Sequence, residues 1–113
     1  MSVLQSARGH FKDQLAGELN SIKVPEWDTT VYYKNISTFV QEQKIIELHA
    51  KGELVSALVE TLLQKALNKD GKQLFKNADR DILMREVDPN VIIRVCTEIN
   101  ASKVKAEETS LGN

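Results

Sequence analysis

The sequence is poor in cysteine, glycine, proline and aromatic residues, and it contains no long hydrophobic run. Its one cysteine, Cys96, excludes an internal disulfide framework and is typical of a reducing compartment. The five glycines are scattered, so they form no glycine-rich phosphate-binding loop. No apolar run approaches the roughly 20 residues of a membrane span, and the first residues lack the apolar segment of a signal peptide. We therefore expect a soluble, cytosolic protein with no membrane partner.

An excess of charge of either sign is also missing. Fifteen lysines and arginines face sixteen acidic residues, giving a net charge of -1, and the two signs are interspersed. Binding to duplex DNA or RNA is favoured by a basic surface. The last predicted helix has only Arg94 along its apolar part, with Glu98 nearby, so it does not resemble a recognition helix. We expect no nucleic-acid partner, which disfavours a transcriptional regulator.

Residues that could carry chemistry are few. The histidines, His10 and His49, belong to different predicted helices, and neither has a partner at metal-binding spacing. A nucleophilic pair of Cys96 and His49 is disfavoured, because Cys96 lies in an apolar stripe where cysteines are usually inert. The turn at residues 68–71 fails as a calcium loop because Asn77 stands where a bidentate glutamate is needed. We expect no enzyme activity, no cofactor and no metal site.

The strongest structural signal is an apolar helix in the middle of the chain. At about 100° per residue, one broad face of the segment that begins at Glu53 is apolar, whereas Glu60 and Thr61 fall opposite. A face this broad predicts a helix that packs against several neighbours. The apolar face comprises Leu54, Val55, Leu58, Val59, Leu62, Leu63, Ala66 and Leu67. With 113 residues and 42% hydrophobic residues, we expect one domain over 1–102 and a disordered tail over 103–113.

The remaining patterns predict the other elements. A helix is expected from about Leu4 to Gly17 and a β-hairpin over 21–33, where β-branched and aromatic residues flank a turn. Ser37 is the predicted N-cap of a helix that runs to about Lys51. After the central helix we expect a turn, a short extended segment ending at Phe75, and a short helix over 78–85. Asp88 and Pro89 predict the start of a last helix, to about Ala101, with Val91, Ile92, Val95, Cys96 and Ile99 on its apolar face. The fold class is α+β, mostly α: an N-terminal helix, a two-stranded hairpin, and three to four helices around a central amphipathic helix.

Apolar residues that the core does not account for are the candidates for protein interaction. In the second helix Phe39, Ile46 and Ala50 share one stripe, which we expect to face the core. Three further apolar residues of this helix point away from that stripe, so the helix either lies between two layers or offers a face to another chain. Trp27 either closes the hairpin or stands exposed for a partner. The candidate interaction residues are Trp27, Val40, Ile45, Leu48 and Ile93.

The order of elements and their local motifs resemble the tail assembly chaperones of long-tailed bacteriophages. The resemblance covers residues 11–101 and is carried by four segments. These are the hairpin segment KVPEWDTTVYYKNIS, the central helix ELVSALVETLLQKAL, the turn and extended element DGKQLF, and the last helix NVIIRVCTEINA.

The resemblance implies a non-enzymatic protein of the host bacterial cytoplasm that is absent from the mature virion. Its implied partners are the tape measure protein, which it keeps soluble, and the major tail tube protein, which it recruits. It further implies a longer product made by translational frameshifting, and the surplus apolar residues add an expectation of self-association. The alternative is a small structural phage protein, such as a ring-forming head-tail connector or a tail completion protein.

Overall fold

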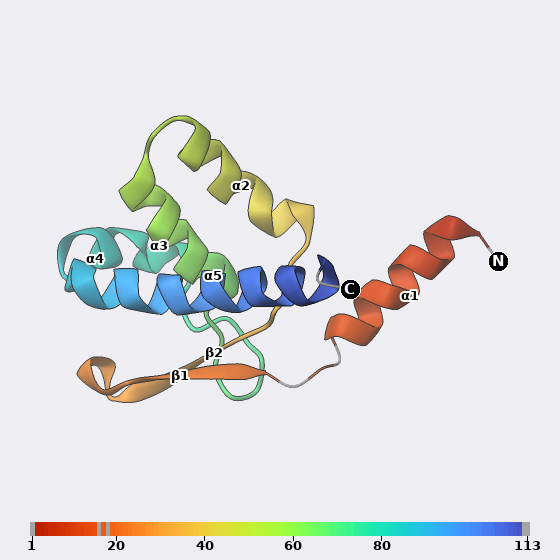
Figure 1. The fold of residues 1–113 in the computed structure, drawn as a ribbon. Helices are drawn as coiled ribbons and strands as arrows, with labels where there is room; N and C mark the ends of the chain where they lie inside the picture. The colour runs from red at the N-terminus through yellow and green to blue at the C-terminus, as the bar shows by residue number, and fades with distance from the viewer. Residues whose placement is uncertain (1, 16, 18, 112–113) are drawn as a thin grey trace.

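The structure is a computed structural model that describes residues 2–15, 17 and 19–111, with side chains described for these residues except Leu15 and residues 102–111. The elements follow the predicted order, and the expected α+β, mostly α fold class is confirmed (Figure 1). They are α1 Val3–Leu15, β1 Asn20–Val24, η1 Pro25–Trp27, β2 Thr29–Tyr33, α2 Phe39–Ala50, α3 Leu54–Lys65, η2 Asn77–Asp79, α4 Arg80–Arg85 and α5 Pro89–Leu111.

Strands β1 and β2 form the predicted antiparallel hairpin, in which Ile22 pairs with Val31. The turn is a single 3-10 turn that starts at Pro25 and ends at Asp28, whose φ of 51° is left-handed. Proline suits the first position of such a turn because its φ is already fixed and its missing N–H has no partner there. On its other side β2 pairs with Leu67: the N–H of Tyr32 donates to the carbonyl of Leu67, at 2.9 Å, and the N–H of Leu67 donates back to the carbonyl of Tyr32, at 2.7 Å.

The segment after α3 forms the predicted turn, and of the expected extended segment Gln73 forms an isolated bridge with Leu67 before the chain bends at Leu74 and Phe75. Asn68 closes the turn, since its side-chain oxygen accepts hydrogen bonds from the N–H groups of Asp70 and Lys72, at 2.9 and 3.1 Å. Gly71 has a φ of 81°, a left-handed conformation that glycine adopts without the steric cost of a Cβ. The chain then returns beside the end of α3, where the N–H of Leu74 donates to the carbonyl of Ala66.

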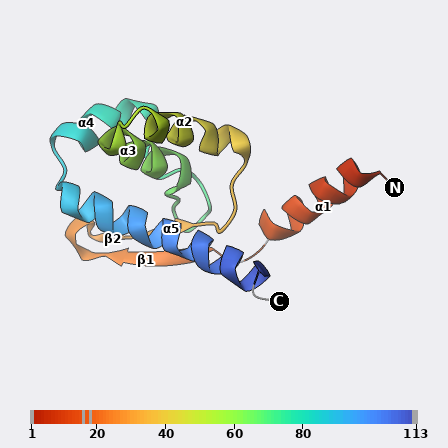
Figure 2. The same cartoon turned by 45° about the horizontal axis from the view of Figure 1, so that its top comes forward.

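Helix α3 is the central element. It contacts α2, α4 and α5, and α5 also contacts β1. Two views show α5 lying between the hairpin and the α2–α3 pair (Figures 1 and 2). The core joins apolar side chains of the hairpin, α3, α4 and α5, with Leu58 half-buried at its margin. Its buried members are Val24, Val31, Tyr33, Val59, Leu62, Leu63, Ala66, Leu83, Val91, Ile92, Val95, Cys96 and Ile99.

Burial extends around α3 beyond its apolar face, which the sequence pattern did not predict. Glu60 and Thr61 were expected opposite the buried face, yet each is only 3% exposed. Both find partners there. A carboxylate oxygen of Glu60 lies 2.9 Å from a guanidinium nitrogen of Arg80, and the Thr61 hydroxyl donates to the carbonyl of Ala57, also at 2.9 Å. A polar residue with a satisfied hydrogen bond can be buried at little cost, whereas a lone one cannot.

The helix ends follow local sequence signals, with one shift. Helix α2 is capped by Thr38 and not by Ser37, because Thr38 and Gln41 form a reciprocal capping box. The carboxylate of Asp88 accepts the N–H of Asn90 at 2.9 Å, so the predicted start of α5 is confirmed. Helix α5 continues to Leu111, beyond the expected end at about Ala101. The side chains of residues 102–113 lie outside the described part, so the domain boundary at residue 102 stays a prediction.

Candidate protein-interaction surfaces

The structure brings few reactive groups together. Among the described residues, no group of three histidine, cysteine or acidic side chains could hold a metal ion. Within the same part of the chain, no helix has the length and apolar character needed to cross a bilayer. Burial raises the pKa of the Cys96 thiol to about 12, so this thiol is protonated at neutral pH, and its Sγ donates to the carbonyl of Leu58 at 3.3 Å. Because the thiolate is the reactive form, Cys96 in the folded protein is a packing residue.

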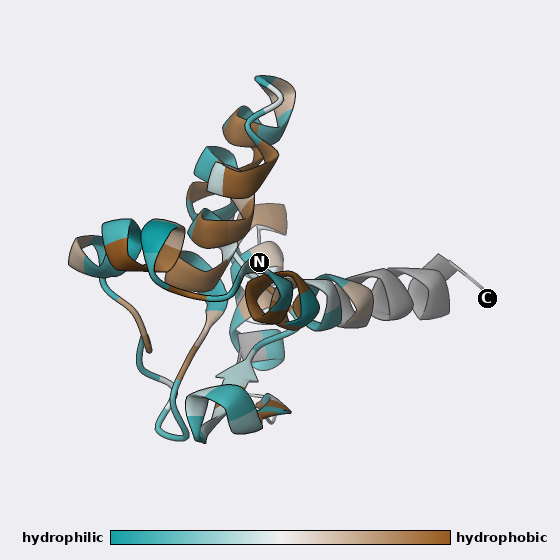
Figure 3. Cartoon of the chain, turned by 90° about the vertical axis from the view of Figure 1, so that its left-hand side faces the viewer, coloured by the Kyte–Doolittle hydropathy of each residue, from teal (hydrophilic) through white to brown (hydrophobic). Residues whose placement is uncertain are grey.

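Large apolar side chains are exposed on the outer face of α2. Phe39, Val40 and Ile46 are 87%, 80% and 54% exposed. Phe39 and Ile46 are seven residues apart, almost two helical turns, so they lie on one side of the helix. Figure 3 shows hydrophobic segments along the α2–α3 pair, which rises above the rest of the chain. We call the surface formed by Phe39, Val40 and Ile46 the α2 face.

This arrangement corrects the predicted orientation of α2. The stripe containing Phe39 and Ile46 was expected to face the core, yet it faces solvent. Ile45 and Leu48, two of the candidate interaction residues, are each only 6% exposed, so the expectation that they lie outside the core is wrong. Val40 is exposed, as expected.

A partly buried ion pair lies on the inner face of α2. Glu42 lies three residues before Ile45, and its carboxylate is 2.7 Å from the ammonium of Lys65 in α3. The two side chains are only 13% and 10% exposed, so the pair belongs to the contact between the helices. Glu42, Ile45 and Leu48 are spaced by three residues and therefore share the inner face. The period of apolar residues in α2 does not reveal that Glu42 has this partner.

Apolar side chains are also exposed on α1, α3, α4 and α5. Leu54 and Val55 are 58% and 62% exposed at the start of α3, although they belong to the stripe that was expected to be buried. They precede the part of α3 that α5 covers, as the contact between Leu58 and Cys96 shows. Ile93 is exposed on α5, away from the buried stripe, as predicted.

Trp27 lies at the tip of the hairpin, half-buried against Phe75. The two rings meet edge to face, with centroids 5.9 Å apart and planes at 86°. Beside them is an apolar hollow of about 330 Å³, which we call the tip hollow. Its lining residues come from the hairpin, the extended segment, α4 and the loop that follows α4: Trp27, Thr29, Leu74, Phe75, Leu83 and Val87. Trp27 therefore both packs against the domain and lines an open surface.

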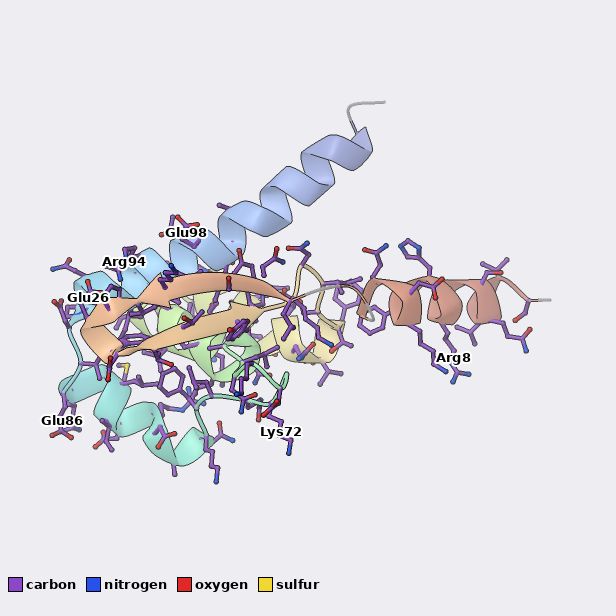
Figure 4. The ribbon with its side chains drawn as sticks, turned by 90° about the horizontal axis from the view of Figure 1, so that it is seen from below. Arg8, Glu26, Lys72, Glu86, Arg94 and Glu98 are labelled. Atoms are coloured by element: carbon purple, nitrogen blue, oxygen red, sulfur yellow. The ribbon has the colours of Figure 1, made fainter. Side chains whose placement is uncertain are left out.

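An ion pair holds the hairpin tip against α5. The carboxylate of Glu26 accepts two hydrogen bonds from the guanidinium of Arg94, at 2.6 and 2.7 Å (Figure 4). The hydrogen bond from Arg94 lowers the pKa of Glu26 to about 2, so the pair persists at any pH above the acid range. Glu26 and Arg94, which are 68 positions apart in the sequence, thus hold the turn that carries Trp27 against α5.

Comparison with known proteins identifies the fold. No protein-family model and no curated protein matches the chain. Among solved structures, the tail assembly chaperone of bacteriophage HK97 is similar over 91% of this chain and 94% of that chain, with a TM-score of 0.58 and 16% sequence identity. The elements that carry the sequence resemblance are therefore arranged as in a protein of that kind. The chain has the fold of a phage tail assembly chaperone.

Proposed function

We propose that this protein is a tail assembly chaperone of a long-tailed bacteriophage. The observation that carries the proposal is the likeness to the HK97 tail assembly chaperone, which extends over nearly the full length of both chains. In this role the protein binds the tape measure protein in the host cytoplasm, keeps it soluble, recruits tail tube subunits and leaves before the virion matures. It performs no catalysis.

The α2 face is the surface that we assign to the tape measure protein. A soluble protein rarely exposes large apolar side chains together unless they contact a partner. Phe39 and Ile46 are placed to contact the apolar stripe of an amphipathic helix, which matches the long hydrophobic helices implied for a tape measure protein. Binding there covers the residues of the tape measure protein that would otherwise aggregate.

Co-expression with the tape measure protein tests the role. The fraction of tape measure protein that stays in the supernatant is measured with and without this chain, and we expect a large increase with it. A tape measure protein that is equally soluble, or equally insoluble, in both cases contradicts the proposal. Finding the chain in purified virions contradicts it too, and favours the head-tail connector or tail completion alternative.

Variants locate the surface. The double change Phe39→Glu and Ile46→Glu places two charges on the α2 face without removing core residues, so we expect a folded protein that no longer solubilises the tape measure protein. Lys72→Glu, at an exposed residue outside α2 that changes the net charge by the same amount, is the matched control and should behave as the parent. If the double variant is folded and fully active, another surface binds the tape measure protein.

A further inference from the structure

Helix α1 projects from the body of the molecule (Figures 1 and 2). Its apolar stripe has Leu4, which is 70% exposed, Ala7, which is exposed, and Phe11, which is partly buried. A helix of 13 residues is marginal in water without packing, and Gly9 in its middle weakens it further. A capping box between Ser2 and Gln5 supports only its first turn. A surface that covers the stripe would therefore add much to the stability of α1.

The charges of α1 indicate what kind of surface could cover its apolar stripe. Arg8 and Lys12 adjoin Phe11 on the helix, and neither forms a salt bridge among the described residues. One large apolar side chain flanked by two cations fits an apolar hollow with an acidic rim.

The tip hollow has these properties. Its lining is apolar apart from Thr29. Four exposed carboxylate residues adjoin Trp27 or Val87 in the sequence: Glu26, Asp28, Glu86 and Asp88. Two cationic residues oppose them, Arg94, which is paired with Glu26, and Lys76, which follows Phe75. The rim is therefore acidic on balance.

We propose that α1 of one copy of the protein docks in the tip hollow of a second copy, with Phe11 in the hollow and Arg8 and Lys12 at its acidic rim. The inference does not rest on the proposed function, and it gives the expected self-association a specific interface. Figure 4 shows Arg8 at one end of the molecule and Glu26 and Glu86 at the other. Docking between these ends joins copies head to tail, because each copy offers one helix and one hollow.

A second copy is favoured over the chain's own α1 by the connection. Helix α1 precedes β1, which begins at Asn20, whereas the tip hollow lies beyond the other end of β1, at Trp27. In the structure α1 points away from that end. An interface made from one short helix is small, so the association is weak and depends on protein concentration.

Sedimentation velocity over a wide concentration range tests the inference, with Trp27 fluorescence as a local readout. Trp27 is the single tryptophan of the chain, so a blue shift with concentration reports that the tip hollow is being covered. Two variants each remove one half of the contact: Phe11→Glu on α1 and Thr29→Arg at an exposed residue of the hollow. We expect each alone to be monomeric. Ser6→Glu, on the opposite side of α1, and Lys72→Glu are the controls and should associate as the parent does.

Mixing the two variants gives the sharpest result. Each variant retains the half that the other lacks, so the mixture should form a 1:1 dimer that cannot grow further, with the emission shift confined to Trp27 of the Phe11→Glu protein.

Glu86→Lys should weaken association several-fold and replaces Thr29→Arg if that variant does not fold. A parent that is monomeric throughout, or a Thr29→Arg protein that is folded and still associates, overturns the inference. An emission change caused by Phe11→Glu with no change in mass also overturns it, because it places α1 in the hollow of its own chain. None of these outcomes affects the solubility test with the tape measure protein.

Discussion

Glu60 is the residue whose burial depends most on one distant partner. Its side chain is 5% exposed, and the guanidinium of Arg80, which is 38% exposed, accounts for its salt bridge. Replacing Arg80 by alanine leaves a buried carboxylate without its cation, which should cost roughly 1–3 kcal/mol of unfolding free energy. Urea unfolding measures the change.

Arg85→Ala is the matched control for Arg80. Arg85 pairs with Asp81 at 2.8 Å, but both side chains are 76% exposed, so water already solvates the two charges. The expected loss is below about 0.5 kcal/mol. Equal losses for the two variants would mean that the burial of Glu60 has no energetic consequence.

The ionisation of Cys96 should make the stability of the protein depend on pH in the alkaline range. The thiol ionises near pH 9 when exposed, whereas burial raises its pKa to about 12 in the folded state. The folded state therefore favours the protonated form, so the stabilisation is complete below about pH 9 and is lost as the pH rises toward 12. We expect the parent to lose more stability over this range than Cys96→Ala does, as measured by unfolding at a series of pH values. Identical pH profiles would contradict the raised pKa.

At the scale of elements, α3 is the helix that contacts α2, α4 and α5. Leu62 is fully buried where α3 meets the hairpin and α5, so Leu62→Ala should cost roughly 2–5 kcal/mol through lost burial and a residual cavity. Thermal or urea unfolding measures the loss. Leu54→Ala, on the same helix at a residue that is 58% exposed, is the control and should cost far less. A loss under about 0.5 kcal/mol for Leu62→Ala would show that α3 is not central.

The orientation of α2 could not be predicted from the sequence of this helix alone. The period of an amphipathic helix defines its faces, but it does not say which face is turned inward when both carry apolar residues. In the structure Glu42 faces Lys65 of α3, and Ile45 and Leu48, on the same side of α2, are buried. Val40→Glu is therefore expected to leave the fold intact, whereas Leu48→Glu should unfold it, and circular dichroism distinguishes the two outcomes. Two folded variants would contradict the buried position of Leu48.

At the scale of the whole molecule, the predicted domain boundary remains to be tested. Residues 103–113 show no apolar periodicity, so few groups there can offset the entropy lost on ordering. Removing them should leave the melting temperature nearly unchanged. A fall of many degrees would mean that the end of α5 packs against the domain or against a second copy.

The elements themselves are determined by the sequence alone. Asp88 and Pro89 start α5, Gly71 permits the turn after α3, and alternating β-branched residues form the hairpin. These signals act within a few residues, through caps, backbone conformation and one-sided burial, so they can be read without knowing the rest of the chain. The order of elements and the buried stripe of α5 were predictable for the same reason.

The surfaces were decided by tertiary structure. The tip hollow joins Trp27 to Phe75 and Val87, and its wall is fixed by Glu26 and Arg94, which are 68 residues apart. The sequence marked Trp27 and Val40 as candidates, but it could not show that Trp27 has an apolar hollow beside it. It also could not show that α2 turns Phe39 outward. Periodicity records only which residues of an element lie together, whereas a surface depends on which neighbours cover the element, and those contacts form between distant parts of the chain.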